Sequence, residues 1–150
     1  MKIASILENQ KIEKRVAITP EIAKKYISLG FEVSLSKNYG SHLGIIDQEY
    51  KDLGVLILKD EKEIITNADI IAQLSLLDDD KSFLLKANQT FVGVLNPYDN
   101  KDKISNLVKK NINTFSLELL PRITRAQSMD ILSSQANLAG YKAVVESFAN

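Results

Sequence analysis

Short runs of branched and aromatic residues alternate with longer polar segments along most of the chain. Six such runs lie at residues 2–7, 31–36, 55–58, 70–74, 91–95 and 112–116. The segments between them have the lengths of helices, and this alternation is typical of βα units around a mostly parallel sheet. The pattern therefore predicts an α/β domain with a doubly wound sheet, similar to flavodoxin or Rossmann folds.

The first helix has the clearest end signals. Thr19 can cap it, Pro20 suits the first helical position, and Gly30 can close it. Another helix is expected to open at Asp60, because Glu63 lies three residues on and completes a capping pair. Further helices are expected at residues 47–53 and after Pro97, the latter with Asp99 or Asn100 as its cap.

From about Ser128 the pattern becomes one long helix of small and apolar residues, which reaches Asn150 without a stop signal. An interior glycine costs a helix about 1 kcal/mol relative to alanine. Gly140 therefore suggests that another backbone approaches the helix closely. The chain is expected to divide into a domain at residues 1–127 and, at residues 128–150, the start of a helix leading to a further domain.

Composition narrows the classes of function. Nineteen basic residues balance nineteen acidic ones, which gives no reason to expect a nucleic acid or an anionic membrane as a direct partner. There is no cysteine and only one histidine, His42, so neither thiol chemistry nor a multi-histidine metal centre is expected. The sequence has no uninterrupted run of about 18 apolar residues, so it gives no reason to expect a membrane-spanning helix.

Polar side chains crowd the segment between the last expected strand and the long helix. Ligands of open α/β sheets bind just outside the carboxyl ends of the strands, and a helix start adds free N–H donors. Arg122, Gln127 and Asp130 could offer a cation, an amide and a carboxylate to one ligand there. The alternative is that Arg122, Arg125 and Asp130 form solvated ion pairs while Gln127 caps a helix.

The common short motifs of nucleotide binding, nucleophilic catalysis and zinc binding are missing. The sequence contains no G-x-G-x-x-G, no Walker loop, no G-x-S-x-G and no histidine-rich zinc motif. His42 lies in a glycine-containing loop and is expected to be a surface or packed side chain. The run Asp78-Asp79-Asp80 is expected to form a solvated turn before a helix, since metal loops alternate ligands with other residues.

Residues 121–141, PRITRAQSMDILSSQANLAGY, resemble the signature of the alpha subunit of proton-translocating nicotinamide nucleotide transhydrogenases. Residues 13–20, EKRVAITP, are similar to a motif shared by the wider group that joins alanine dehydrogenases to transhydrogenases. Asp47, Tyr50 and Gly54 also fit that group. The resemblance covers essentially the whole chain.

The resemblance implies that the loop contacts the nicotinamide end of NAD(H), which binds mainly to a following Rossmann subdomain that this chain lacks. Gln127 and Asp130, with Arg122, would hold the ring for hydride transfer to NADP(H) on a partner component, a reaction that needs positioning more than an acid or base. The positions matching the family's cofactor-binding residues are Arg122, Ile123, Thr124, Gln127, Ser128, Met129, Asp130 and Ser133.

The resemblance also implies partners and a location. The family's component is a homodimer that sits at the cytoplasmic side of the inner membrane, on a membrane-embedded, proton-conducting partner. The complete complex is then an oxidoreductase and translocase, while this chain alone is expected to be inactive and to bind NAD(H) weakly or not at all.

Two other interpretations compete with this one. Alanine dehydrogenases place a lysine and a histidine in the substrate pocket where this chain has Ser75 and Asn96. Their substrate-binding arginine corresponds to Arg15, for which a structural ion pair is the simpler role here. A non-enzymatic receiver-type signalling domain would use acidic residues such as Glu8 and Asp60, but Asn9 weakens the acidic pair and no lysine follows Leu95.

Overall fold

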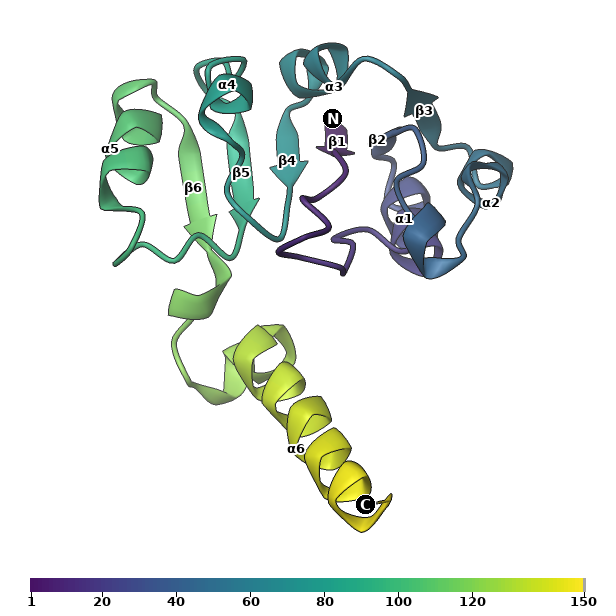
Figure 1. Cartoon of the computed structure of the whole chain (residues 1–150). Helices are drawn as coiled ribbons and strands as arrows, with labels where there is room; N and C mark the ends of the chain where they lie inside the picture. The colour runs from purple at the N-terminus through teal and green to yellow at the C-terminus, as the bar shows by residue number, and fades with distance from the viewer. Residues whose placement is uncertain (150) are drawn as a thin grey trace.

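Six parallel strands form one sheet in the computed structural model, which describes residues 1–149 (Figure 1). The order across the sheet is β3-β2-β1-β4-β5-β6, and every neighbouring pair is parallel. This is the strand order of a Rossmann sheet, so the predicted doubly wound fold is confirmed. The strands are β1 (Lys2–Ser5), β2 (Glu32–Ser36), β3 (Leu56–Leu58), β4 (Ile70–Ala72), β5 (Thr90–Gly93) and β6 (Asn113–Ser116).

Helices cover both faces of the sheet because alternate strand residues point to opposite sides. Ile3 of β1 belongs to the apolar cluster beneath α1 (Pro20–Ser28) and α2 (Asp47–Asp52). Its neighbour Ala4 belongs to the cluster on the other face, beneath α3 (Glu61–Asn67) and α5 (Lys101–Lys109). The remaining elements are α4 (Asp79–Ser82), α6 (Ile131–Ala149) and the 3-10 helices η1 (Ser41–Leu43), η2 (Leu117–Leu119) and η3 (Thr124–Met129).

The helix ends follow the sequence signals closely. Thr19 Oγ1 accepts a hydrogen bond from the Ile22 amide at the start of α1, and Gly30 follows the helix with a φ of 86°. Asp60 accepts from the Lys62 amide at the start of α3. Asn100 is the residue before α5, but its side-chain oxygen accepts no hydrogen bond from a helix amide, and its side-chain NH₂ donates to the Leu95 carbonyl oxygen.

Two helices begin elsewhere than expected. The long helix, α6, begins at Ile131 rather than near Ser128, because the residues before it form the tighter turns of η3. Asp130 has an extended backbone and caps α6, so the helix cannot start earlier. The acidic run at Asp78 does not form a separate turn: α4 begins at Asp79, where carboxylates favour the positive end of the helix dipole.

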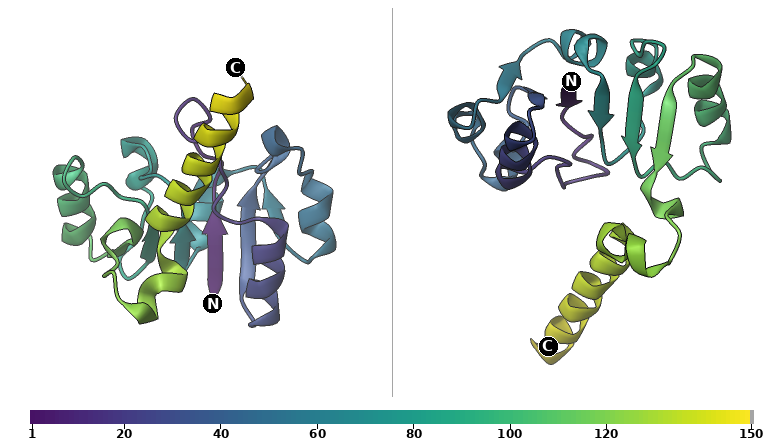
Figure 2. Two further views of the ribbon diagram at one scale, coloured as in Figure 1. Left: turned by 90° about the horizontal axis from the view of Figure 1, so that it is seen from below. Right: turned by 180° about the vertical axis from the view of Figure 1, so that it is seen from behind.

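The long helix projects from the body at the side to which the carboxyl ends of the strands point (Figures 1 and 2). Its residues 132–149 are all exposed, including Leu138, Tyr141 and Phe148. A Cβ built on Gly140 would meet nothing within 4 Å, so any close approach to Gly140 would have to come from outside this chain. A helix that is apolar on several sides is normally packed against other protein.

Candidate functional site

The candidate site is the polar loop between β6 and α6. After β6 ends at Ser116, the chain makes one turn as η2, extends through Pro121, and turns again as η3. The Ile123 amide donates to the Pro121 carbonyl oxygen and the Ala126 amide to that of Ile123, which gives the loop its tight course. Ala126 is the only buried residue of the loop's residues 121–130, so the polar side chains point into solvent.

The loop surrounds a cavity of about 370 Å³. An adjoining cavity of about 390 Å³ lies at the start of α6. The first is lined by Pro121, Arg122, Ile123, Thr124, Ala126, Gln127, Asp130 and Ser133, and the second by Gln127, Ser128, Met129, Asp130, Ile131, Ser133 and Ser134. The structure thus gathers all the expected cofactor-binding positions around two neighbouring hollows.

Asp130 has a second task besides facing the cavity. Its Oδ1 accepts hydrogen bonds from the Leu132 and Ser133 amides, each at 3.0 Å, and its Oδ2 accepts one from Ser133 Oγ at 2.6 Å. These bonds, above all the one from Ser133 Oγ, lower the pKa of Asp130, and the charge of Arg122 adds to the effect. Asp130 is therefore an ionised carboxylate that fixes the start of α6 beside the cavity.

Arg122 and Gln127 line the loop cavity, and Arg122 does so without forming an ion pair within the described part of the chain. Both are exposed, and none of the ion pairs found within residues 1–149 includes Arg122 or Arg125. The solvated ion pairs of the alternative interpretation are therefore not formed, and the helix cap is Asp130 rather than Gln127. The loop offers a guanidinium, an amide and a carboxylate on one rim.

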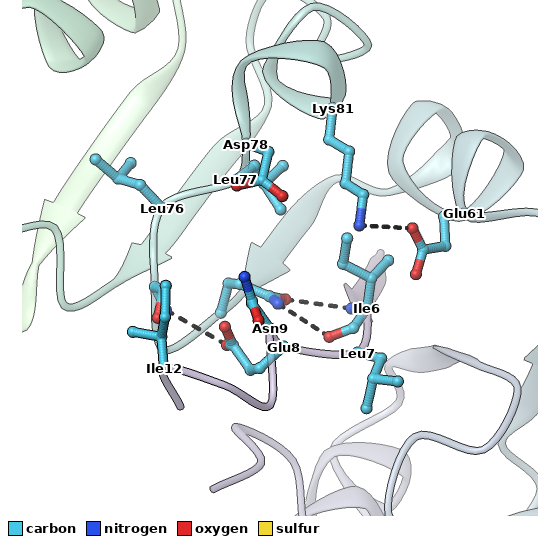
Figure 3. Close-up of a pocket in the computed structure, with 12 residues that line it drawn as sticks. Ile6, Leu7, Glu8, Asn9, Ile12, Glu61, Leu76, Leu77, Asp78 and Lys81 are labelled. Carbon is cyan, nitrogen blue, oxygen red and sulfur yellow. Dashed lines mark hydrogen bonds and ion pairs between the residues drawn. The ribbon is translucent and has the colours of Figure 1, made fainter. Parts of the chain in front are cut away.

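Another polar cavity, of about 340 Å³, lies at the carboxyl ends of β1 and β4 (Figure 3). The strands β1 to β3 extend the sheet toward one edge, and β4 to β6 extend it toward the other. The order in which strands are added therefore reverses between β1 and β4. Open α/β sheets often bind ligands at such a point. Two polar residues at this cavity are almost fully covered: Glu8 is 7% exposed and Gln73 is 3% exposed.

Glu8 and Gln73 tie the two strand ends together. Glu8 Oε1 accepts hydrogen bonds from the Leu74 amide at 2.6 Å and the Ser75 amide at 3.4 Å. Gln73 spans the same gap, with its Oε1 accepting from the Ile6 amide and its Nε2 donating to the Ile6 carbonyl oxygen. Burial raises the pKa of Glu8 despite these hydrogen bonds.

The cavity at the ends of β1 and β4 is poorly suited to a carboxylate substrate. Its wall carries Glu8, Asp78 and an ion pair of 2.9 Å between Lys81 and Glu61, so acidic groups outnumber basic ones. Ser75, the position at which the alanine dehydrogenase interpretation requires a lysine, lines this cavity. The cavity therefore offers little to the substrate of an alanine dehydrogenase.

The other two positions of the alanine dehydrogenase interpretation have structural roles. Arg15 is bound on two sides by Glu13, with Nε–Oε1 at 2.9 Å and Nη2–Oε2 at 2.7 Å, which confirms the structural ion pair expected for it. At Asn96 it is the backbone amide that has such a role, since it donates to Glu118 Oε1. His42 is an exposed side chain whose Nε2 hydrogen-bonds the Lys14 carbonyl oxygen, in agreement with a surface role.

Glu8→Gln is expected to make the protein's stability less dependent on pH. Because burial raises the pKa of Glu8 above 4.5, its contribution to stability is complete below that pH and is lost as the pH rises through the folded-state pKa. Glutamine can still accept from the Leu74 and Ser75 amides but cannot ionise. We expect the difference in melting temperature, variant minus wild type, to be a few degrees larger at pH 7 than at pH 4. In a domain of this size, 1 kcal/mol of stability corresponds to about 2–4 °C in melting temperature.

Glu21→Gln is a suitable control for this measurement. Glu21 is an exposed carboxylate whose pKa is lowered by its partner Lys25 at 2.7 Å, so its small contribution has the opposite pH dependence. Thermal melts of both variants at the two pH values suffice. An equal difference between Glu8→Gln and the wild type at pH 4 and pH 7 would contradict the prediction.

Neither a metal nor a membrane span is indicated by the described part of the chain. Within residues 1–149, acidic, histidine and cysteine side chains do not converge in a group of three that could hold a metal ion. No helix in the same range combines the length and apolarity needed to cross a bilayer.

Comparisons with known proteins show which family the chain resembles. The family model "Alanine dehydrogenase/PNT, N-terminal domain" matches residues 6–139. An NAD(P) transhydrogenase subunit alpha chain of Rickettsia prowazekii is 47% identical over 97% of this chain and 39% of its own length, and one of Rhodospirillum rubrum is 38% identical over the same shares. The chain thus spans about two fifths of these relatives.

A solved structure shows the same likeness in three dimensions. The transhydrogenase from Sinorhizobium meliloti superposes with a TM-score of 0.88 at 39% identity, over 96% of this chain and 43% of that one. The family match extends through the loop and into the first part of α6, to residue 139. The chain therefore belongs to the alanine dehydrogenase/PNT N-terminal domain family and resembles the N-terminal portion of NAD(P) transhydrogenase alpha subunits.

Proposed function

We propose that this chain is the N-terminal subdomain of the NAD(H)-binding component of a proton-translocating NAD(P) transhydrogenase. Its loop at residues 121–130 would position the nicotinamide of NAD(H) for hydride transfer to NADP(H). The observation that carries the proposal is the pair of open cavities around Arg122, Gln127 and Asp130 at the carboxyl edge of the sheet.

The three side chains match the hydrogen-bonding groups of a nicotinamide carboxamide, which offers one carbonyl acceptor and an NH₂ donor. Arg122 donates, Asp130 accepts, and Gln127 can do both. The two oxygens of Asp130 already accept from the start of α6, but a carboxylate has room for about four hydrogen bonds. Because Asp130 is held by Ser133, it would contribute a pre-positioned charge rather than a mobile one.

The chemistry needs little from the protein beyond position. When bound, the two nicotinamides supply the reaction themselves: one gives up a hydride with its electron pair, the other accepts it, and no proton is gained or lost in the transfer. The loop would hold one nicotinamide ring in the orientation that hydride transfer needs and exclude other orientations of that ring. The scarcity of acid–base groups around the loop is consistent with such a role.

We propose that a Rossmann subdomain completes the site. The exposed apolar surface of α6, with Leu138, Tyr141 and Phe148, and the relatives' greater length both support such a neighbour. That subdomain would supply the glycine-rich loop and the acidic residue that holds the adenosine ribose.

The complete complex would bind NADP(H) on a separate component, conduct protons through a membrane-embedded one, and contain this component as a homodimer on the cytoplasmic side of the inner membrane. The relatives' name, NAD(P) transhydrogenase, supports the reaction proposed for this complex. Hydride transfer is then an activity of the assembly, and the chain alone is inactive.

Titration with NADH tests whether most of the NAD(H) binding comes from the Rossmann subdomain rather than from this chain. We expect the 150-residue chain to bind with a dissociation constant no tighter than about 1 mM, and a form extended through the next domain to bind about a thousand times more tightly. Fluorescence of bound NADH reports both, with NADPH as the control nucleotide that the extended form should bind much less well. Micromolar binding by the short chain would refute the division proposed here.

A further inference from the structure

Two buried oxygen atoms at the root of the loop have no hydrogen-bond partner. Within residues 1–149, the buried side-chain nitrogen and oxygen atoms that lack a partner are Ser116 Oγ and Glu118 Oε2. They belong to residues two apart, one at the end of β6 and the other in η2. Unpaired buried polar atoms are rare in native proteins and call for an explanation.

The other carboxylate oxygen of Glu118 has a defined task. Glu118 Oε1 accepts the amide hydrogen of Asn96, which lies just beyond β5 with a φ of 45°. Glu118 therefore joins the loop after β5 to the loop after β6. Because η2 also contacts α6, whose start is capped by Asp130, Glu118 lies at the base of the whole loop.

The loop above Glu118 has few restraints. All five residues from Pro121 to Arg125 are exposed, and apart from the bonds within η3 the backbone hydrogen bonds that hold them are the two short-range ones at Ile123 and Ala126. A segment with so few buried contacts can shift at low cost. Arg122, four residues after Glu118, is the first cation to follow it in the chain.

We propose that Glu118 is a positioning residue, whose Oε2 accepts a hydrogen bond from the Arg122 guanidinium when the loop takes up its ligand. Pairing with a carboxylate would hold the guanidinium plane in one orientation, and its remaining N–H groups would still face the ligand. This inference rests on the proposed function, because the ligand is the nicotinamide of NAD(H).

Two substitutions separate the two oxygens of Glu118. Glu118→Gln keeps an acceptor for the Asn96 amide but replaces the carboxylate that Arg122 needs. Glu118→Ala removes both. In the complete enzyme, we expect Glu118→Gln to slow single-turnover hydride transfer about 10- to 100-fold with an unchanged melting temperature, and Glu118→Ala to lower the melting temperature as well.

A double-mutant cycle with Arg122→Gln tests whether the two residues act together. If they form a pair, Glu118→Gln should cause no further loss of rate in the Arg122→Gln background. The pairing is wrong if the two losses multiply, or if Glu118→Gln transfers hydride within twofold of the wild type. It is also wrong if Glu118→Gln and Glu118→Ala lower rate and melting temperature alike, since Glu118 would then be purely structural.

Gln127→Ala, measured beside these variants, separates this inference from the proposed function. If Gln127→Ala slows hydride transfer while Glu118→Gln transfers hydride at the wild-type rate, only the role of Glu118 is overturned. A Gln127→Ala enzyme with the wild-type rate would instead remove the nicotinamide loop on which the role depends.

Discussion

Gln127→Ala in the complete enzyme is expected to slow hydride transfer about 100-fold while changing the dissociation constant of NADH by no more than about threefold. The exposed amide of Gln127 lines both cavities of the loop, where it can donate and accept at once. Most of the binding energy of NADH would come from the Rossmann subdomain, so loss of the amide should affect the orientation of the ring more than its capture.

Single-turnover kinetics with equilibrium titration measures the two effects separately. The substitution should leave the loop intact, since the backbone carbonyl of Gln127 and not its side chain receives the Asp130 amide. Gln48→Ala is the matched control, because Gln48 is an exposed glutamine of α2 that bonds only to Asp52 across one helical turn. Equal losses of rate and of affinity would mean that the loop anchors the cofactor without orienting it.

Asp130 needs a different substitution. Alanine would remove the cap of α6 together with the carboxylate, and the two effects could not be told apart. Asparagine is also a good cap and retains the side-chain oxygen. A slow Asp130→Asn enzyme with a normal melting temperature would therefore implicate the charge itself.

The architecture could be predicted because its determinants are local. Runs of branched residues mark the six strands, and residues such as Thr19 and Gly30 mark the helix ends. The predicted strands are too long at their carboxyl ends, at residues 6–7, 73–74 and 94–95. After β1 the backbone leaves the ladder and bonds to side chains, Ile6 to Gln73 and Leu7 to Ser36, and after β4 the Leu74 amide donates to the Glu8 carboxylate.

The loop could be located for a related reason, while its detailed geometry could not. Parallel strands end at one edge, so polar residues after the last strand must lie there. The sequence predicts too early a start for α6 because Ser128 and Met129 continue the pattern of small and apolar residues. Asp130 directly before Ile131 and Leu132 is the available signal, since an acidic or hydroxyl residue before an apolar run is a common cap.

The contacts of the Glu8 and Glu118 carboxylates could not be predicted from sequence patterns. Glu8 is bonded to an amide 66 positions away, and Glu118 to one 22 positions away. Neither residue has a neighbour in the sequence that indicates the contact. Only the winding of the sheet, which brings the ends of β1 and β4 and of β5 and β6 together, creates these pairs.

Gly93→Ala is expected to prevent stable folding. A Cβ on Gly93 would lie 2.1 Å from the carbonyl oxygen of Gln73, a backbone atom of the neighbouring strand end that cannot rotate away. Overpacking costs about 1–3 kcal/mol even where side chains can adjust. Here the displaced residue is Gln73, whose buried amide also holds Ile6 and Ser5, at about 1 kcal/mol for each hydrogen bond lost.

The summed loss approaches the lower end of the total stability of a domain, which is about 5 kcal/mol. We expect Gly93→Ala to be insoluble or to lack a cooperative thermal transition. Gly140→Ala is the control: its new Cβ meets nothing within 4 Å, and alanine favours a helix over glycine by about 1 kcal/mol, so the chain should become no less stable. A Gly93→Ala chain that melts within about 3 °C of the wild type would show that the ends of β4 and β5 can separate without disturbing the bonds of Gln73.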